Sequence, residues 1–156
     1  MPYLVDGHNL IPKLGLRLDA VDDEQELIVI LREFCRLESK QVEVFFDGAP
    51  PLQAGTRKLG AVTAHFVRLG TTADDAIRSR LQRLGKSARN WTVVSSDRQV
   101  QAEGRAVHAQ VLSSESFADR LKQARESAPK PADERKLSGQ EVEEWLRIFG
   151  KRKGNQ

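Results

Sequence analysis

Short apolar runs alternate along the chain with longer segments in which apolar residues recur every three or four positions. The short runs are typical of buried strands, which we expect at residues 3–6, 42–46, 62–67, 91–95 and 106–109. The longer segments predict helices at residues 23–39, 73–84, 98–103 and 113–125. Because parallel strands need a crossover connection, usually a helix, this alternation predicts an α/β fold with a mainly parallel sheet.

Residues at the ends of these segments set their limits. Thr72 can cap the helix that follows it, and Gly85 can end that helix. Gly104 is expected to end the next, shorter helix in the same way. Two prolines and two glycines between residues 50 and 60 predict a loop there.

The last thirty residues have a different character. Residues 127–137 are rich in proline and charge and lack periodicity, which is typical of a linker. Ser138 and Glu141 then form a capping box that opens a helix with an apolar stripe, and a basic tail follows that helix. We therefore expect one domain at residues 1–126, a linker, and a C-terminal helix and tail at residues 138–156. Such a helix is not stable alone, so it is expected to dock on the domain or on a partner.

Composition narrows the class of protein. The 156 residues are 39% hydrophobic and 30% charged, which suits one soluble domain with one core. No run of about 18 apolar residues predicts a membrane span, and the N-terminal residues lack the pattern of a secretory signal. Cys35 is the single cysteine, so an internal disulfide is excluded. We expect Cys35 to be a core residue and the protein to be cytoplasmic.

Charge is distributed unevenly along the chain. Residues 1–60 hold 7 basic and 10 acidic residues, a net charge of −3. Residues 61–156 hold 18 basic and 12 acidic residues, a net charge of +6. The basic second part is compatible with a polyanionic partner, although a basic surface is often only a solvated one.

Three of the predicted strands lead into an aspartate. Asp6 ends the first strand, Asp47 follows the second, and Asp97 follows the strand at residues 91–95. The carboxyl ends of parallel strands share one edge of a sheet, where ligands usually bind. We therefore expect these three acids to converge, provided that their strands are neighbours.

The helix at residues 73–84 supplies a further acid to this edge. With Ile77 placed at 0° on a helical wheel, Leu81 falls at about 40° and marks the buried face. Asp74 falls at about 60°, beside that face, whereas Asp75 falls at about 160°, toward solvent. Asp74 is thus the better inward acid, and Asp75 is a candidate for a supporting position.

Carboxylates gathered at one edge repel one another unless a cation neutralises them. Mg²⁺ and Mn²⁺ take carboxylate oxygens and can activate water for attack on a phosphodiester. Basic residues in loops or at sheet edges are candidates for holding the phosphates, namely Arg57, Lys58, Arg68, Arg78 and Arg98. This pattern favours metal-dependent phosphodiester chemistry.

Each polar residue also has a structural interpretation. Aspartate is favoured in turns after strands, and Asp97 can cap a helix. Asn9 either contacts metal or substrate or bonds to backbone groups. His8 stays undecided, and His65 and His108 fit packed or surface positions better than ligand positions. No P-loop, GxGxxG after the first strand, HExxH, paired CxxC or GxSxG motif is present.

Four motifs occur in order along the chain: YLVDGHNLI, VEVFFDG, TTADDAI and VVSSDRQV. Together they resemble the YacP-like branch of the NYN domains, within the PIN-like nuclease superfamily. The resemblance covers roughly residues 1–125, and the segment LSGQEVEEWLRIFG also resembles one found in this branch.

The resemblance implies a PIN-like three-layer α/β/α sandwich and a metal-dependent endoribonuclease. On the matching motifs, Asp6, Asp74 and Asp97 correspond to the family's metal-binding acids, and Asn9 to a polar position beside them. Asp47 matches an FDG element whose role is less defined. Some relatives act on messenger RNA in association with ribosomes, so RNA and the ribosome are the partners to be tested.

Two other functions are compatible with the same residues. The first is a non-catalytic module that binds RNA or ribosomes through the basic second part and the C-terminal helix. A pure binder would gain nothing from carboxylates gathered near phosphates. The second is a metal-dependent phosphohydrolase of small phosphate esters, which would favour a closed pocket over a basic groove.

Overall fold

The computed structural model describes residues 1–16 and 21–127. Its strands are β1 (Tyr3–Asp6), β2 (Val42–Ala49), β3 (Gly55–Leu59), β4 (Val62–Arg68), β5 (Thr92–Val94) and β6 (Gln110–Leu112). Its α-helices are α1 (Gly7–Leu10), α2 (Val21–Glu38), α3 (Ala73–Leu84), α4 (Arg98–Ala106) and α5 (Ser114–Glu126). Two short 3-10 helices, η1 (Ile11–Leu14) and η2 (Gly85–Asn90), follow α1 and α3.

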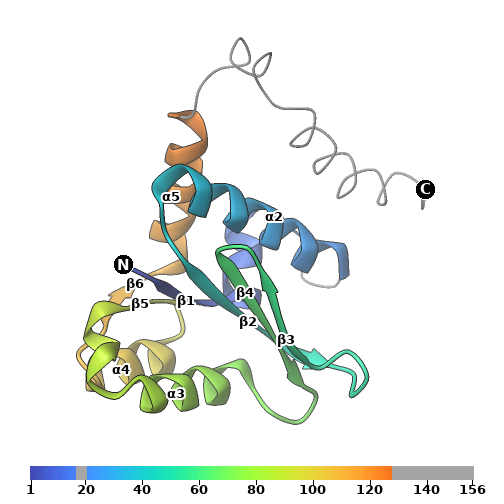
Figure 1. Ribbon diagram of the computed structural model, residues 1–156, viewed down its shortest axis with the longest axis vertical. Coiled ribbons are helices and arrows are strands. Elements are labelled where there is room, and N and C mark those ends of the chain that lie inside the picture. The colour runs from blue at the N-terminus through green and yellow to red at the C-terminus, as the bar shows by residue number, and fades with distance from the viewer. Residues whose placement is uncertain (17–20, 128–156) are drawn as a thin grey trace. The chain divides into compact units, whose positions relative to one another are not determined.

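The strands form one sheet in the order β3-β4-β2-β1-β5-β6 (Figure 1). All neighbouring pairs are parallel except β3 and β4, which form an antiparallel hairpin at one edge. The predicted mainly parallel sheet is therefore confirmed. The strands that lead into Asp6, Asp47 and Asp97 lie at the centre of the sheet, with β1 between β2 and β5.

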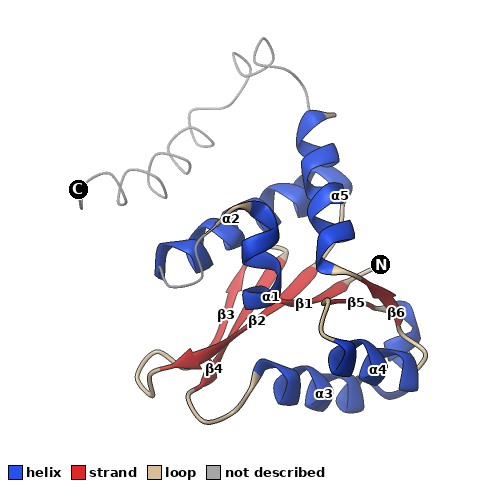
Figure 2. Ribbon diagram, turned by 180° about the vertical axis from the view of Figure 1, so that it is seen from behind, coloured by secondary structure: helices blue, strands red, loops and turns tan. Residues whose placement is uncertain are grey.

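Helices cover both faces of the sheet, as Figure 2 shows. On one face α1, α2 and α5 pack against side chains such as Val5, Val44 and Phe46. On the other face α3 and α4 pack against Leu4, Phe45 and neighbouring residues. The alternation of side chains along each strand separates the two cores. The fold is thus the three-layer α/β/α sandwich that the family resemblance implied.

Helix α3 begins and ends where the sequence predicted. The Thr72 hydroxyl accepts a hydrogen bond from the backbone N–H of Asp75 (3.0 Å), and Gly85 follows the last helical residue with a φ of 56°. A second contact holds the middle of the helix on the sheet. Arg80 donates two hydrogen bonds to Glu43 of β2, from Nε (2.9 Å) and Nη2 (2.8 Å).

The predicted loop at residues 50–60 is wrong in its second half. Residues 55–59 form β3, which pairs with β4 in antiparallel register. Their sequence, GTRKL, has no apolar alternation because nearly all of this edge strand is exposed to solvent. Its pairing with β4 comes from backbone hydrogen bonds, which a hydrophobic pattern does not reveal.

Two further boundaries differ from the prediction. Helix α4 continues through Gly104, which packs against the sheet: a Cβ there would lie 3.1 Å from the Val93 side chain and 3.2 Å from that of Val111. This glycine permits close packing of helix on strand and does not end the helix. The strand expected at residues 106–109 is also displaced, since the chain forms β6 at Gln110–Leu112 instead.

The chain divides into two compact units, Met1–Arg125 and Glu126–Gln156. The linker beyond residue 127 and the predicted helix at 138–156 lie outside the described residues. Within the described residues, no helix is both long and apolar enough to cross a membrane. Cys35 is buried, as expected, and burial raises the pKa of its thiol to about 11.

Candidate active site

Three of the predicted acids lie at the carboxyl ends of adjacent strands. Asp6 is the last residue of β1. Ser95 directly follows β5, and Asp97 lies two residues after Ser95. Asp47 lies in β2, where the ladder with β4 shifts register between Phe46 and Ala49. The condition set by the sequence, that these strands be neighbours, is met.

Ser95 connects two of these acids. Its hydroxyl donates to Asp6 Oδ2 (3.2 Å) and accepts from the backbone N–H of Asp97 (3.0 Å). Burial raises the pKa of Asp6 to about 6, the Ser95 hydrogen bond opposes this shift, and the charge of Asp47 adds to it. Asp6 is therefore a largely desolvated carboxyl group for which a nearby cation would be favourable.

Asp97 is exposed and caps helix α4. Its Oδ1 accepts from the backbone N–H of Gln99 (2.8 Å) and of Val100 (3.4 Å). The capping role that the sequence allowed is thus present in the structure. Its second oxygen, Oδ2, takes no part in these two contacts.

Asn9 fixes the loop between β5 and α4. Its Oδ1 accepts from the backbone N–H of Ser96 (2.8 Å) and from the Ser114 hydroxyl (2.6 Å). Of the two interpretations left open by the sequence, the backbone-bonding one is observed. This contact joins α1 to the segment that carries Asp97.

Asp74 and Asp75 point in different directions, as the helical wheel predicted. Oδ1 of Asp74 is buried and has no hydrogen-bond partner among the described residues. Asp75 is half exposed and forms an ion pair with Arg78 one turn later in α3. Asp6 follows Leu4 by two residues on β1, and Leu4 packs with Ala73 and Ile77. By strand alternation, Asp6 also points toward the layer of α3.

Glu103 is an acid that the sequence reasoning missed. It lies in α4 and faces Asp74, and its Oε2 is likewise buried without a hydrogen-bond partner among the described residues. Burial, then the adjacent Asp74, which can accept a hydrogen bond from Glu103 only when Glu103 is protonated and whose charge opposes ionisation, raise the pKa of Glu103 to about 7. A proton on Glu103 would supply the donor that two ionised carboxylates lack. The signal in the sequence was its position three residues after Val100, on the buried side of α4. The sequence had predicted Glu103 to be the last residue of that helix.

His8 and Asp47 form a second group at the same edge. His8 Nδ1 lies 2.9 Å from Asp47 Oδ1, and His8 Nε2 lies 2.6 Å from Oε2 of Glu24. The hydrogen bond with Glu24 is the main cause that raises the pKa of His8. Asp47 Oδ2 also lies 3.5 Å from the backbone nitrogen of Ala73, the first residue of α3. Glu24 lies in the first turn of α2.

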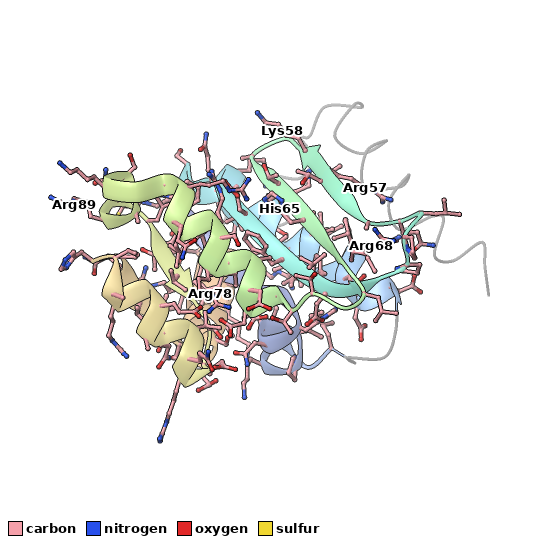
Figure 3. The ribbon with its side chains drawn as sticks, turned by 90° about the horizontal axis from the view of Figure 1, so that it is seen from below. Arg57, Lys58, His65, Arg68, Arg78 and Arg89 are labelled. Atoms are coloured by element: carbon pink, nitrogen blue, oxygen red, sulfur yellow. The ribbon has the colours of Figure 1, made fainter. Side chains whose placement is uncertain are left out.

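The predicted phosphate-binding residues are spread over four elements, and Figure 3 labels four of the five residues. Arg57 and Lys58 are exposed on β3, and Arg68 is exposed at the end of β4. Arg98 is exposed in the first turn of α4, next to Asp97. Arg78 lies between α3 and α4 and is engaged by Asp75 and by Glu103, whose Oε1 is 3.6 Å from Arg78 Nε.

The two histidines that the sequence set aside lie outside this edge. His65 Nε2 lies 2.9 Å from Glu43 Oε1, and its ring stacks on Phe45 with centroids 4.5 Å apart. His108 is exposed just before β6, at the amino edge of the sheet. Neither is placed to act with the acids.

The acids fit a hard divalent cation by their donor chemistry. Buried carboxylate oxygens without partners on Asp74 and Glu103, and the desolvated carboxyl of Asp6, would each be stabilised by such an ion. Across residues 1–16 and 21–127, no group of three or more acidic, histidine or cysteine side chains is arranged as a metal-binding cluster. The fit is thus one of ligand type and not of a completed coordination sphere.

Comparison with solved structures gives close matches in fold. The structure is similar to the crystal structure of Rae1 (YacP) from Bacillus subtilis, with a TM-score of 0.68 and 26% sequence identity, covering 99% of this chain and 96% of that chain. A tryptophan-to-leucine mutant of Rae1 (YacP) from Bacillus subtilis matches with a TM-score of 0.64 and 24% identity, covering 80% and 77% of the two chains. Comparison with curated protein sequences gave no match.

The family comparison covers nearly the whole chain. The model of the YacP-like NYN domain matches residues 3–149. NYN domains are PIN-like nucleases and generally use divalent metal ions. This chain therefore belongs to the YacP-like NYN domain family of PIN-like nucleases.

Proposed function

We propose that this protein is a divalent-metal-dependent endoribonuclease whose site lies at the carboxyl edge of β1 and β5. The observation that carries the proposal is the set of desolvated, under-partnered carboxyl groups at this edge, above all Asp6 and Asp74. Buried carboxylates without partners are costly, so their presence favours a cation-dependent role. Membership of a nuclease family supplies the reaction class.

Asp6, Asp74 and Asp97 would hold Mg²⁺ or Mn²⁺. When bound, one or two such ions lower the pKa of an attacking water and stabilise charge on the phosphodiester. Ser95 orients Asp6 through its hydroxyl and holds the backbone of Asp97. Asn9 fixes the same loop from the side of α1.

Basic residues would hold the RNA backbone beside these acids. Arg98 is adjacent to Asp97 and exposed, and Arg57, Lys58 and Arg68 line the β3–β4 hairpin. Phosphate contacts of this kind position a strand without reading its sequence. Arg78 is engaged by two acids, so we assign it to charge balance around Asp74 in place of direct phosphate binding.

RNA is the proposed substrate, and the ribosome is a proposed further partner. A cytoplasmic location belongs to the same proposal. Cosedimentation of the full chain with purified ribosomes, with and without added RNA, tests the ribosome part separately from catalysis.

The main test incubates the protein with end-labelled single-stranded and structured RNA in Mg²⁺, Mn²⁺ or EDTA. We expect internal cleavage in either metal and none in EDTA. Binding of RNA without cleavage under all conditions would favour the binding module. Hydrolysis of a small phosphate ester with intact RNA would favour the phosphohydrolase.

A further inference from the structure

His8 lies between two carboxylates at the acid edge. Its Nδ1 is 2.9 Å from Asp47 Oδ1 and its Nε2 is 2.6 Å from Glu24 Oε2. A ring nitrogen that carries hydrogen donates to the carboxylate it faces, so the ring is placed to bridge the two acids. The ring also packs near Phe46, with centroids 5.5 Å apart.

These contacts join elements from both helical layers. Glu24 belongs to the first turn of α2 on one face of the sheet. His8 belongs to α1, directly after β1, and Asp47 belongs to β2. Asp47 Oδ2 lies 3.5 Å from the nitrogen of Ala73, at the start of α3 on the other face. The path from α2 to α3 therefore runs through the His8 ring.

The same geometry argues against two other roles. A histidine acting as a general acid needs a ring nitrogen that can reach the substrate, but both nitrogens of His8 are occupied by carboxylates. Asp47, in turn, has Oδ1 toward His8 and Oδ2 toward Ala73. Asp47 thus has its oxygens directed at protein groups and supports the site from outside.

We propose that His8 is a positioning residue, which ties Glu24 to Asp47 and thereby holds the first turn of α3, where Asp74 lies. This inference rests on the function proposed above, because it gives His8 a role in that same site. Partners that orient metal-binding side chains typically contribute about 10–100-fold to metal affinity or activity. We expect His8 to fall at the lower end of this range, since it acts on Asp74 through Asp47 and Ala73.

The test compares four proteins: wild type, His8→Phe, Glu24→Gln and the double variant. Phenylalanine keeps a ring beside Phe46 and removes both ring nitrogens. Glu24→Gln keeps the shape of the second partner and removes its charge, and it carries the test if His8→Phe does not fold. His108→Asn is the matched control, because His108 is exposed at the opposite edge with a φ of 64° that asparagine tolerates.

Three quantities are measured on each protein: Mn²⁺ affinity by electron paramagnetic resonance, kcat and KM for RNA cleavage, and amide hydrogen exchange at residues 73–76. For His8→Phe we expect Mn²⁺ affinity and kcat to fall about 10-fold, with KM nearly unchanged and faster exchange in the first turn of α3. Glu24→Gln should change the same quantities in the same direction by less. The double variant should resemble His8→Phe, because both residues act through one unit.

Several results would overturn the inference. If His8→Phe bound Mn²⁺ more tightly, His8 would act through its charge and not through position. Wild-type Mn²⁺ affinity, kcat and exchange in both single variants would also contradict it. A wild-type protein that neither binds Mn²⁺ nor cleaves RNA would overturn the proposed function and this inference with it. Failure of the inference alone would leave wild-type binding and cleavage intact, so the two failures are distinguishable.

Discussion

Asp74 of α3 and Glu103 of α4 face each other, and each has one buried oxygen without a hydrogen-bond partner among the described residues. They lie on two helices that cover the same face of the sheet. Arg78 compensates them only in part, because its nearest contact with Glu103 is 3.6 Å long and Arg78 itself is 45% exposed. The pair is therefore a local cost to stability that a cation would relieve.

Glu103→Gln is expected to stabilise the metal-free protein at pH 8 by about 1–2 kcal/mol. The glutamine amide can donate to Asp74, which relieves a buried acceptor without a partner, whereas the lost contact with Arg78 is worth less than about 0.5 kcal/mol. The pKa of Glu103 is raised from 4.5 in the unfolded chain to about 7, so the cost of its ionisation develops between pH 4.5 and 7 and is fully present at pH 8. Urea unfolding at pH 8 and pH 4 should show the gain only at pH 8. An equal gain in exposed Glu38→Gln would refute this account.

Substitutions at Asp97 should separate its two roles. Asparagine caps helices as well as aspartate does, so Asp97→Asn should change the free energy of unfolding by less than about 0.5 kcal/mol. Asp97→Ala loses the cap and should cost about 1 kcal/mol. Both should slow RNA cleavage by about 100-fold or more. Wild-type cleavage by Asp97→Asn would leave Asp97 with capping alone.

The Glu43–Arg80 pair predicts a loss of stability in acid. Burial alone would raise the pKa of Glu43, but hydrogen bonds with His65 and Arg80 outweigh it and lower the pKa from 4.5 to about 2. A lowered pKa stabilises the fold above pH 4.5, and this contribution is lost as the pH falls toward 2. We expect it to be about 1–2 kcal/mol, allowing for partial solvent screening. In urea unfolding, Glu43→Gln should lose less stability between pH 4.5 and 2.5 than wild type or Glu38→Gln; a parallel decline would contradict the assignment.

Lys58 tests the proposed path of the RNA. In an Asp6→Asn background that prevents cleavage, Lys58→Gln should weaken binding to all RNA sequences alike. It should also lower the slope of log Kd against log salt concentration by about one. Lys122→Gln is the control, since Lys122 is exposed on α5, which carries none of the proposed phosphate-binding residues. Equal salt slopes in the two variants would place the RNA elsewhere.

The sequence predicted most of the sandwich because its central strands are buried. Val42 and Val44, for example, have almost no exposed surface, so their apolar run was a reliable signal. The edge strand β3 gave no such signal, since its residues face solvent. The role of Gly104 was predicted wrongly for a related reason. Its close packing depends on Val93 of β5 and Val111 of β6, which a local sequence pattern does not place beside it.

The site was predictable where a strand end or the periodicity of a single helix supplied the residue, as for Asp74 in α3. Asp6 and Asp97 could be placed together from strand order alone. Glu103 could not, because its approach to Asp74 depends on how α4 packs beside α3. The same holds for Glu24, because its contact with His8 depends on how α2 packs beside α1.

The single-turnover rate of RNA cleavage by Asp6→Asn in saturating Mn²⁺ tests the central claim most directly. Asparagine can still accept the Ser95 hydrogen bond, so the variant should fold and bind RNA like the wild type. We predict cleavage at least about 100-fold slower than in the wild type and in Asp119→Asn, a control at an exposed position on α5. Cleavage by Asp6→Asn at the wild-type rate would contradict a catalytic site built on Asp6.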